Sequence, residues 1–448
     1  GSGESRKLCR ISPKASTSLL KQAAHSWYVG LFHLPGLAPA AWALAGEQGW
    51  ARFLQQVEHL DTPRRNPTQV QDGQAGVQLY RSNFASRLAR PNERRTDLPV
   101  QLLCPVGDHY MVQSIWDELS RWVPNLWRRD LDAGHWVISS EPQRVAAAIR
   151  EFVGFVETGE ESSPVKRARA LAHRPRGVLS GKLAVVTGAG SGFGRECAVL
   201  FAEQGADLIV VDIKEEAVQR TAELCELLGA CAWAQQVDVS DSGQIESLAN
   251  WVGEQFEAPD IVINNAGIGA AGSFFDTTRA DWDAVLGVNL RGVIEGARLF
   301  GAQMQAAGRR GHMVNVASMG AYTPSRFMAA YNTSKAAVRM LSDCLRAELA
   351  EDGIHVATIC PGLSITNITR STRFLGADSE EQTRRRKATT QLYTRRNLKP
   401  EQIAESILDA IVHRRDEVPV GTEAHAMRLL SRLAPAVSRR LARMDLAV

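Results

Sequence analysis

From residue 177 onward, short apolar runs alternate with longer stretches in which apolar residues recur at helical spacing. Short apolar runs bounded by turn residues are typical of strands that are buried on both faces. The strand-like runs cover residues 183–187, 207–212, 233–239, 260–266, 312–318 and 355–361. The helical patterns cover residues 194–204, 215–228, 244–255, 282–305 and 329–351. This alternation predicts an α/β fold with helices on both faces of one parallel sheet, the doubly wound arrangement.

The chain is expected to contain more than one domain, because 448 residues exceed the length of a typical single domain. Residues 1–159 are rich in Trp and Leu and mix helical with strand-like patterns. Residues 160–178 are polar and basic and contain proline, with too little apolar surface to order themselves. We therefore predict a first domain over 1–159, an exposed linker over 160–178 and a second domain over 179–448.

The composition argues against several classes of protein. A formal net charge of +3 over 448 residues gives no reason to expect nucleic-acid binding. The seven cysteines are dispersed, with no CxxC pair and no histidine cluster at metal spacing, which favours reduced thiols, no metal and a cytoplasmic location. No apolar run approaches the roughly 18 residues that a membrane span needs.

A glycine-rich string, Thr187–Gly194, follows the first strand-like run of the second domain and opens a helical pattern. Glycine suits this position because the chain turns tightly and its backbone must approach a pyrophosphate closely. The start of the helix then offers free N–H groups and a positive dipole end to that anion. The strand before the string and the helix after it predict a dinucleotide site, whereas the glycines alone would fit an ordinary turn.

Asp212 ends the second strand-like run, where a carboxylate can bond both ribose hydroxyls of an adenosine. The same carboxylate would repel a 2′-phosphate, and the next residue, Ile213, is not a cation. Both observations favour NAD over NADP, although the nearby Lys214 leaves NADP open. The alternative is that Asp212 only caps the following helix.

Tyr331 and Lys335 share one face of a predicted helix, because they are four residues apart. An ammonium beside a phenol favours the phenolate and lowers the phenol pKa from its usual value near ~10. General acid/base catalysis requires such a pKa. Ser318 ends a strand-like run, at the edge of the sheet where such folds bind ligands. Taken singly, the Tyr–Lys pair would fit an ordinary surface helix better.

The order and spacing of these motifs resemble the short-chain dehydrogenase/reductase family. The glycine string is joined by Asp238 in an Asp-Val-Ser sequence, by Asn264-Asn265-Ala266-Gly267, by Asn289 in Val-Asn-Leu, and by a Pro361–Thr366 loop. The resemblance implies a Rossmann fold and catalysis by Ser318, Tyr331, Lys335 and Asn289. Together, the pattern and the resemblance assign cofactor binding to Gly188, Ser191, Gly192, Phe193, Gly194, Asp212, Ile213, Asp238, Val239, Asn265, Ala266, Gly267, Tyr331, Lys335, Pro361, Gly362 and Thr366.

This resemblance also implies a role for each catalytic residue. Tyr331 is expected to be the acid/base, and Lys335 to lower its pKa while binding the nicotinamide ribose. Ser318 would hold the reacting oxygen, and Asn289 would support a water that links Lys335 to solvent. The family tends to form dimers and tetramers through the helices that carry Asn289 and Tyr331, so a homodimer or homotetramer is expected.

The end of the first domain resembles the last two strands of an α/β-hydrolase, with Asp108 and His135 at the positions of the triad acid and histidine. Tyr28 and Tyr80 fall where epoxide-hydrolase members carry two cap tyrosines. The part that bears the nucleophile has no counterpart here, and no G-x-S-x-G occurs in the chain. Without a nucleophile, Asp108 and His135 have nothing to activate.

We therefore expect a partial α/β-hydrolase with a helical cap and a sheet with one unpaired edge. Asp108 and His135 should still meet, facing no nucleophile, and packing is the better interpretation of Tyr28 and Tyr80. Hydrolysis of an epoxide or ester would then belong to a longer parent protein with two activities.

The C-terminal end carries two basic features. Residues 363–400 lie where the family places its substrate lid, and the cluster 384–387 fits a solvated helix face better than an anion site. From Glu423 the sequence predicts a basic amphipathic helix that is interrupted at Pro435. Such a helix can lie on an anionic membrane or pack against its own or a neighbouring subunit.

The sequence thus predicts an oxidoreductase that transfers hydride between a nicotinamide cofactor and a secondary alcohol or ketone. The hydrolase-like segment hints at a bulky, apolar substrate. A non-catalytic nucleotide-binding scaffold is the remaining alternative, although a scaffold has no need of the Ser318, Tyr331 and Lys335 set.

Overall fold

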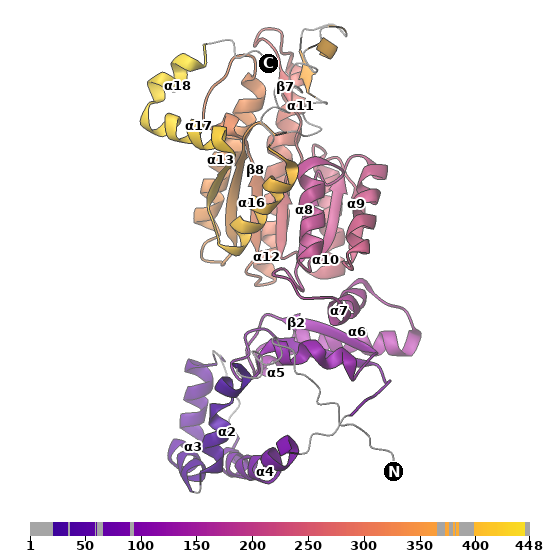
Figure 1. Cartoon of the computed structure of the whole chain (residues 1–448), viewed down its shortest axis with the longest axis vertical. Helices are drawn as coiled ribbons and strands as arrows, with labels where there is room; N and C mark the ends of the chain where they lie inside the picture. Colours follow the sequence, from indigo (N-terminus) through magenta and orange to yellow (C-terminus); the bar gives the residue numbers. More distant parts are fainter. Residues whose placement is uncertain are drawn as a thin grey trace, which may run out of the picture. The chain divides into compact units, whose positions relative to one another are not determined.

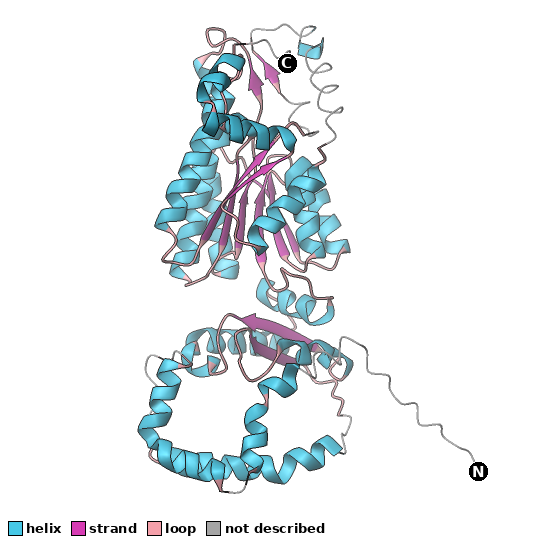
Figure 2. Cartoon of the chain, turned by 60° about the vertical axis from the view of Figure 1, so that its left-hand side comes forward, coloured by secondary structure: helices cyan, strands magenta, loops and turns pink. Residues whose placement is uncertain are grey.

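The computed structural model describes residues 21–34, 36–58, 60, 66–89, 94–364, 372–375, 380, 382–384 and 398–443. The chain divides between His173 and Arg174 into two compact units (Figures 1 and 2). Among the described residues, no single helix is long and apolar enough to cross a membrane. The helices α2 (Trp27–His33) and α3 (Leu37–Gln56), bent by 109°, pass that test only when they are taken together.

The second unit is built on one large sheet. Its strands are β3 (Leu183–Thr187), β4 (Asp207–Asp212), β5 (Ala232–Gln236), β6 (Ile261–Asn264), β8 (His312–Val316), β9 (His355–Pro361) and β11 (Glu417–Val420). All pairings are parallel, and the strand order is β11-β9-β8-β6-β3-β4-β5. The predicted doubly wound sheet is confirmed. The seventh strand, β11, was not predicted, because four residues that include a glutamate and a proline give no apolar run.

Helices cover both faces of this sheet (Figure 2). On one face, α8, α9 and α16 pack over the strands, and on the other face α10, α12 and α13 do so. Because the strand order reverses beside β3, the carboxyl ends of β3 and β6 border the crevice where such folds bind ligands. The helices of this unit are α8 (Gly192–Glu203), α9 (Glu215–Leu227), α10 (Ser242–Phe256), α11 (Arg279–Leu286), α12 (Gly292–Ala306), α13 (Ala329–Glu348), α16 (Pro400–Val412), α17 (Thr422–Leu433) and α18 (Pro435–Leu441).

The helix predicted over residues 282–305 is split in the structure. A π-helical turn, η2 (Gly287–Arg291), separates α11 from α12. A 3-10 turn, η3 (Met319–Ala321), follows β8, and a pair of two-residue strands, β7 (Ala270–Ala271) and β10 (Arg373–Phe374), completes the described part of the unit. The split was missed because the apolar periodicity runs through η2 without a proline or polar cluster to mark it.

Among the described residues, the first unit contains a two-stranded parallel sheet with two unpaired edges, and not the single unpaired edge that was expected. Its strands are β1 (Val100–Pro105) and β2 (Leu126–Leu131), and within the described residues no third strand pairs with either. Large apolar side chains of this unit, Leu44 and Ile138 among them, are exposed to solvent. The other helical elements are α4 (Gln69–Ala89), η1 (Gln113–Arg121), α5 (Val137–Ser140), α6 (Pro142–Thr158) and α7 (Ser163–His173).

The prediction of an exposed linker over residues 160–178 is wrong for α7, which occupies most of that segment. Val165 and Ala168 are buried against Trp127 of β2 and pack beside two phenylalanines of α6. Apolar residues three and six positions apart therefore form a narrow stripe along a helix that is otherwise basic. Because most residues of the segment are polar, this stripe was not recognised from the sequence.

His312 and His355, which begin β8 and β9, face one another with ring centroids 5.6 Å apart. Burial, together with the charges of His355 and Arg414, lowers the pKa of His312 to about 4. Between the ordinary value of 6.5 and this lower value, the unfolded chain binds a proton that the folded chain does not. The free energy of unfolding should therefore fall as the pH falls from about 6.5 to about 4.

We predict that His312→Gln reduces this pH dependence. At pH 5 the histidine should cost the wild type on the order of 1–2 kcal/mol of stability relative to pH 7. Urea unfolding followed by circular dichroism at the two pH values measures the loss. His413→Gln, at an exposed histidine of the same unit, is the matched control. An equal loss in wild type and His312→Gln would assign the effect to other groups.

Candidate active site

The turn between β3 and α8 has no room for side chains at its glycines. Gly188 has φ +66°, and a Cβ added there would lie 2.8 Å from Cα of Ala266. A Cβ at Gly194 would overlap the Gly188 carbonyl and lie 2.6 Å from Nδ2 of Asn265. This close approach of backbone to backbone is the reason for the glycine string, and it leaves the start of α8 open to an anion.

The residues at the start of α8 agree with an anion site. Ser191 precedes the helix, and its side chain makes no capping hydrogen bond among the described residues. Gly192 begins the helix with φ +57°, and Phe193 packs against the core beneath it. The first backbone N–H groups of α8 are thus free of a side-chain acceptor, as a pyrophosphate site requires.

Asp212 is held at the end of β4 beside the glycine turn. Its Oδ2 accepts a hydrogen bond from the Gly190 N–H at 2.9 Å, and its Oδ1 accepts one from the Lys214 N–H at 3.0 Å. The alternative that Asp212 caps the next helix does not apply, because Lys214 is the N-cap residue of α9. Ile213 between them is exposed.

The motif after β6 is bonded directly to the end of β3. The Thr187 hydroxyl accepts hydrogen bonds from the N–H groups of Asn265 (3.0 Å) and Ala266 (3.1 Å). It donates to the Ile263 carbonyl at 3.2 Å, and Asn265 Nδ2 donates to the Thr187 carbonyl at 2.9 Å. The glycine turn and the strand beside it therefore form one rigid edge.

Ser318, Tyr331 and Lys335 are brought together at the carboxyl end of β8. Ser318 precedes η3, and its hydroxyl is hydrogen-bonded to the Tyr331 side chain, which comes from the first turn of α13. Lys335 is buried one turn further along, and its Nζ donates to the Val316 carbonyl at 2.9 Å. The predicted catalytic set thus shares one site.

The predicted lowering of the Tyr331 pKa by Lys335 is wrong. Burial raises the pKa of Tyr331, and the hydrogen bond with Ser318 offsets only part of this rise. Burial also lowers the pKa of Lys335 to about 8. Lys335 has no part in the Tyr331 shift, because its ammonium bonds a backbone carbonyl and not the phenol.

Asn289 lies fully buried in the π-helical turn η2. Its Oδ1 accepts from the Ile268 N–H at 2.8 Å, and its Nδ2 donates to the Ile268 carbonyl at 3.0 Å and to Ser334 Oγ at 3.2 Å. A Cβ added at Gly267 would lie 3.3 Å from Asn289 Oδ1 and 3.5 Å from Lys335 Nζ. Gly267 is therefore where the nucleotide motif and the catalytic residues meet.

The other predicted cofactor residues also lie at the carboxyl edge of the sheet. Asp238 and Val239 follow β5, and Asp238 Oδ1 accepts hydrogen bonds from the N–H (2.9 Å) and hydroxyl (2.7 Å) of Ser240. Pro361 ends β9, and the N–H of Gly362 donates to the carbonyl of Val420 at 2.8 Å. Thr366 lies outside the described residues.

Two further residues of the site were not predicted. Arg195 directly follows the glycine string, and its guanidinium donates to the Gly190 carbonyl and, at 3.3 Å, to Thr221 Oγ1. The position of Arg195 directly after the glycine string could have identified this residue from the sequence. Cys360 of β9 is buried and hydrogen-bonded to the Tyr322 hydroxyl. No spacing in the sequence indicates this second contact, because the two residues are 38 positions apart.

Three comparisons agree with this geometry. Residues 182–374 match the family model described as short chain dehydrogenase. The probable oxidoreductase EphD of Mycobacterium tuberculosis is 38% identical over 445 residues, which cover 96% of this chain and 74% of that protein. The match therefore spans both units.

The C alpha-dehydrogenase of Sphingobium is 31% identical over 265 residues, covering 57% of this chain and 87% of that protein. A crystal structure of a short-chain dehydrogenase/reductase from Burkholderia phymatum in complex with NAD is 30% identical, with a TM-score of 0.54. The match covers 58% of this chain and 96% of the Burkholderia chain. The chain belongs to the short-chain dehydrogenase family. It is an oxidoreductase, and the second unit is its short-chain dehydrogenase unit.

The predicted approach of Asp108 and His135 in the first unit is confirmed. His135 Nδ1 lies 2.8 Å from Asp108 Oδ2, while Asp108 Oδ1 accepts from the N–H groups of Tyr110 (2.7 Å) and Met111 (3.0 Å). Among the described residues, no serine, cysteine or second carboxylate is hydrogen-bonded to His135. The carboxylate of Glu58, which lies nearby, accepts from the Tyr110 hydroxyl at 2.9 Å.

The charges of this pair stabilise one another. Burial alone would raise the pKa of Asp108, but the hydrogen bonds from His135, Tyr110 and Met111 lower it below the usual range. The hydrogen bond with Asp108 raises the pKa of His135, and burial opposes this effect only in part. The pair has the electrostatics of a base held by an acid, and the described residues place no nucleophile against it.

The two cap tyrosines come together beside this pair. Tyr28 packs edge-on against Tyr80, with ring centroids 6.3 Å apart, and against Tyr110 at 5.6 Å. Burial and the neighbouring Tyr80 raise the pKa of Tyr28 to about 12. The contacts are those of an aromatic cluster, which agrees with the interpretation that Tyr28 and Tyr80 are packing residues.

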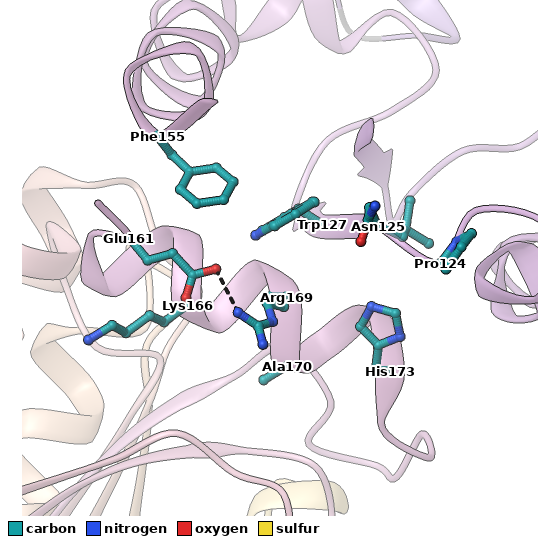
Figure 3. Close-up of a pocket in the computed structure, with 10 residues that line it drawn as sticks. Pro124, Asn125, Trp127, Phe155, Glu161, Lys166, Arg169, Ala170 and His173 are labelled. Atoms are coloured by element: carbon teal, nitrogen blue, oxygen red, sulfur yellow. Dashed lines mark hydrogen bonds and ion pairs between the residues drawn. The ribbon is translucent and has the colours of Figure 1, made fainter. Parts of the chain in front are cut away.

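A separate cavity of about 800 Å³ lies between β2, α6 and α7 of the first unit (Figure 3). Trp127 and Phe155 form its apolar part, and Arg169 on its rim is paired with Glu161 at 3.2 Å. Its lining contains neither Asp108 nor His135. The predicted hydrolase-like residues therefore do not open onto this cavity.

We predict that Asp108→Asn lowers the pKa of His135, because the variant removes the negative charge that favours the imidazolium. The titration of ¹³C-labelled histidines, followed by NMR, measures the change. Asp409→Asn is the matched control, since Asp409 pairs with the exposed His413 at 2.8 Å in the other unit. The assignment would have to be abandoned if His135 titrated identically in wild type and Asp108→Asn.

Proposed function

We propose that the second unit catalyses NAD-dependent hydride transfer between a secondary alcohol and its ketone. The observation that carries this proposal is the hydrogen bond between Ser318 and Tyr331 beside the buried Lys335 ammonium. A hydroxyl pair next to a desolvated cation suits a reaction in which a proton leaves one oxygen while negative charge develops on another. A nucleotide-binding scaffold would have no use for burying that charge.

The residues around the crevice fit a dinucleotide. The glycine turn is packed too closely for a Cβ at Gly188 or Gly194, and α8 offers free N–H groups to a pyrophosphate. Asp212 is fixed where adenosine ribose hydroxyls would bond its carboxylate, and a 2′-phosphate would be repelled there. Arg195 is already bonded to the backbone of the turn, which leaves it less free to bind such a phosphate. When bound, NAD supplies the carbon that accepts or returns the hydride.

The protein's own residues would handle the proton. Tyr331 would take a proton from the substrate hydroxyl, or return it to the ketone oxygen, while the Ser318 hydroxyl bonds that same oxygen. The Lys335 ammonium would bind the nicotinamide ribose, and Gly267 allows Lys335 to approach Asn289. The Asn289 side chain is fully used by Ile268 and Ser334, so its backbone carbonyl is the group left to hold a water.

Exposed aromatic side chains support a bulky or apolar substrate. Phe274 and Phe275 follow β7, and Phe327 lies in the loop between Ser318 and Tyr331, all of them exposed. The two loops are joined, because the N–H of Gly272 donates to the carbonyl of Phe327 at 2.7 Å. An apolar substrate would bury these rings, and a small polar one would leave them in water.

A homodimer or homotetramer remains part of the proposal. Ile294 on α12 and Met340 on α13 are exposed apolar residues on the helices that the family uses for assembly. A hydrolase is the second candidate function, for a longer protein with two activities. The Asp108–His135 pair favours it, although the nucleophile would have to come from outside the described residues.

We predict that Tyr331→Phe lowers kcat by about 10²–10⁴-fold, because general acid–base catalysis contributes that much and a phenyl ring carries no proton. The variant should still bind NAD, which isothermal titration calorimetry tests. Tyr110→Phe, in the first unit, is the matched control and should keep wild-type turnover. A kcat within a few-fold of wild type in Tyr331→Phe would remove Tyr331 from the mechanism.

A second substitution tests the cofactor preference. Asp212→Ser should lower the ratio of kcat/KM with NAD to kcat/KM with NADP at least roughly tenfold. The reason is that the variant loses the repulsion of a 2′-phosphate by a fixed carboxylate. Asp352→Ser, at an exposed aspartate bonded to Gln305, should leave the ratio unchanged. A wild-type kcat/KM that is higher with NADP than with NAD would contradict the preference.

A further inference from the structure

The two C-terminal helices present apolar side chains to solvent in pairs. Leu429 and Leu433 of α17 are 60% and 75% exposed, and Val437 and Leu441 of α18 are 50% and 40% exposed. Each pair is four residues apart, so its members share one side of their helix. The two helices are the yellow elements beyond the carboxyl edge of the sheet in Figure 1. We call these four side chains the apolar pairs.

The same helices are strongly basic. Five arginines and one acidic residue, Glu423, occur between residues 422 and 443. Arg439, Arg440 and Arg443 are exposed and have no acidic partner among the described residues. Exposed apolar side chains next to exposed arginines are typical of a helix that lies in the headgroup region of an anionic bilayer.

These helices are also fixed to the body of the unit. The carboxylate of Glu417 accepts from Arg428 Nε of α17 and from Arg339 Nε of α13, both at 2.6 Å, and Arg432 approaches it at 3.7 Å. Ala424 and Ser438 are buried on the inner side. The apolar pairs therefore face outward from a rigid support, and their exposure is not that of a loose tail.

We propose that the apolar pairs and the arginines beside them dock the protein on an anionic lipid bilayer. A second copy of the chain is the other occupant that could cover such a face. A two-fold contact of this face with itself would bring two sets of exposed arginines together, which like-charge repulsion disfavours. Lipid phosphates complement those arginines, and the acyl boundary accepts the apolar pairs.

Docking would orient the crevice. The strands are parallel, so α17 after β11 and the loop of Phe274 and Phe275 after β6 leave the same carboxyl edge of the sheet. Gly362 also bonds Val420 at the end of β11, so the support of the docking helices touches the Pro361–Gly362 loop. The aromatic loops and the bilayer surface would then share one end of the unit, where an apolar substrate could pass between them.

Flotation of the intact chain with vesicles tests this proposal. We expect at least roughly tenfold stronger binding to vesicles of phosphatidylcholine and phosphatidylglycerol, 1:1, than to phosphatidylcholine alone, with loss of binding as salt is added. The double variant Leu429→Ser/Leu433→Ser should lower binding to the anionic vesicles at least roughly tenfold, because it removes two apolar side chains that the bilayer would bury. The variant Arg439→Glu/Arg440→Glu should lower it by a similar factor.

Leu227→Ser is the matched control, since Leu227 is 83% exposed on α9 of the same unit. Circular dichroism and sedimentation without vesicles accompany each variant. The proposal is overturned if wild type shows no preference for anionic vesicles, or if Leu227→Ser loses as much binding as the double variant. It is also overturned if the double variant converts an oligomer into monomers while vesicle binding is absent. These measurements need no turnover, so they stand or fall separately from the proposed dehydrogenase chemistry.

Discussion

A buried chain of amide hydrogen bonds holds the catalytic helix against the sheet. Asn264 Nδ2 of β6 donates to Asn315 Oδ1 of β8 at 2.8 Å, and Asn315 Nδ2 donates to Ser342 Oγ of α13 at 2.9 Å. All three side chains are fully or almost fully buried, so each lost partner would leave a polar group unsatisfied at a cost of about 1–3 kcal/mol. These hydrogen bonds fix the rotation of α13 about its axis, and with that rotation Tyr331 points toward Ser318.

Close packing at three glycines adds to the effect of these buried hydrogen bonds. Glycines stand at the points where the nucleotide turn, the strand beside it and the catalytic helix approach one another, and a single Cβ at Gly188, Gly194 or Gly267 would meet its neighbour at or inside ordinary contact distance. The cofactor cradle and the proton-handling residues are therefore parts of one packed body. Hydride transfer depends on that property, because small displacements of the reacting groups cost large factors in rate.

The sequence predicted those parts whose requirements are local. A glycine string between a strand and a helix, and Tyr331 four residues from Lys335, need no knowledge of the rest of the chain. What depends on distant partners was missed: the strand β11, the contact of Cys360 with Tyr322, and the stripe that orders α7 against Trp127. The direction of the Tyr331 pKa shift also depends on residues that are distant in the sequence. The four-residue spacing indicates an ammonium nearby, but burial, which decides the direction of the shift, arises only when all the elements pack.

The π-helical turn η2 also fixes the length of the chain around it. A π turn holds one residue more than a regular helical turn, so the sequence from α11 to α12 is one residue longer than a continuous α-helix over the same length would need. The turn takes up the extra residue, and Val285 of α11 and Phe300 of α12 are both buried. Removal of one residue from η2 would restore a continuous α-helix that still turns both of these side chains inward. The extra residue therefore changes the backbone around Asn289 and not the direction of the helix faces on either side.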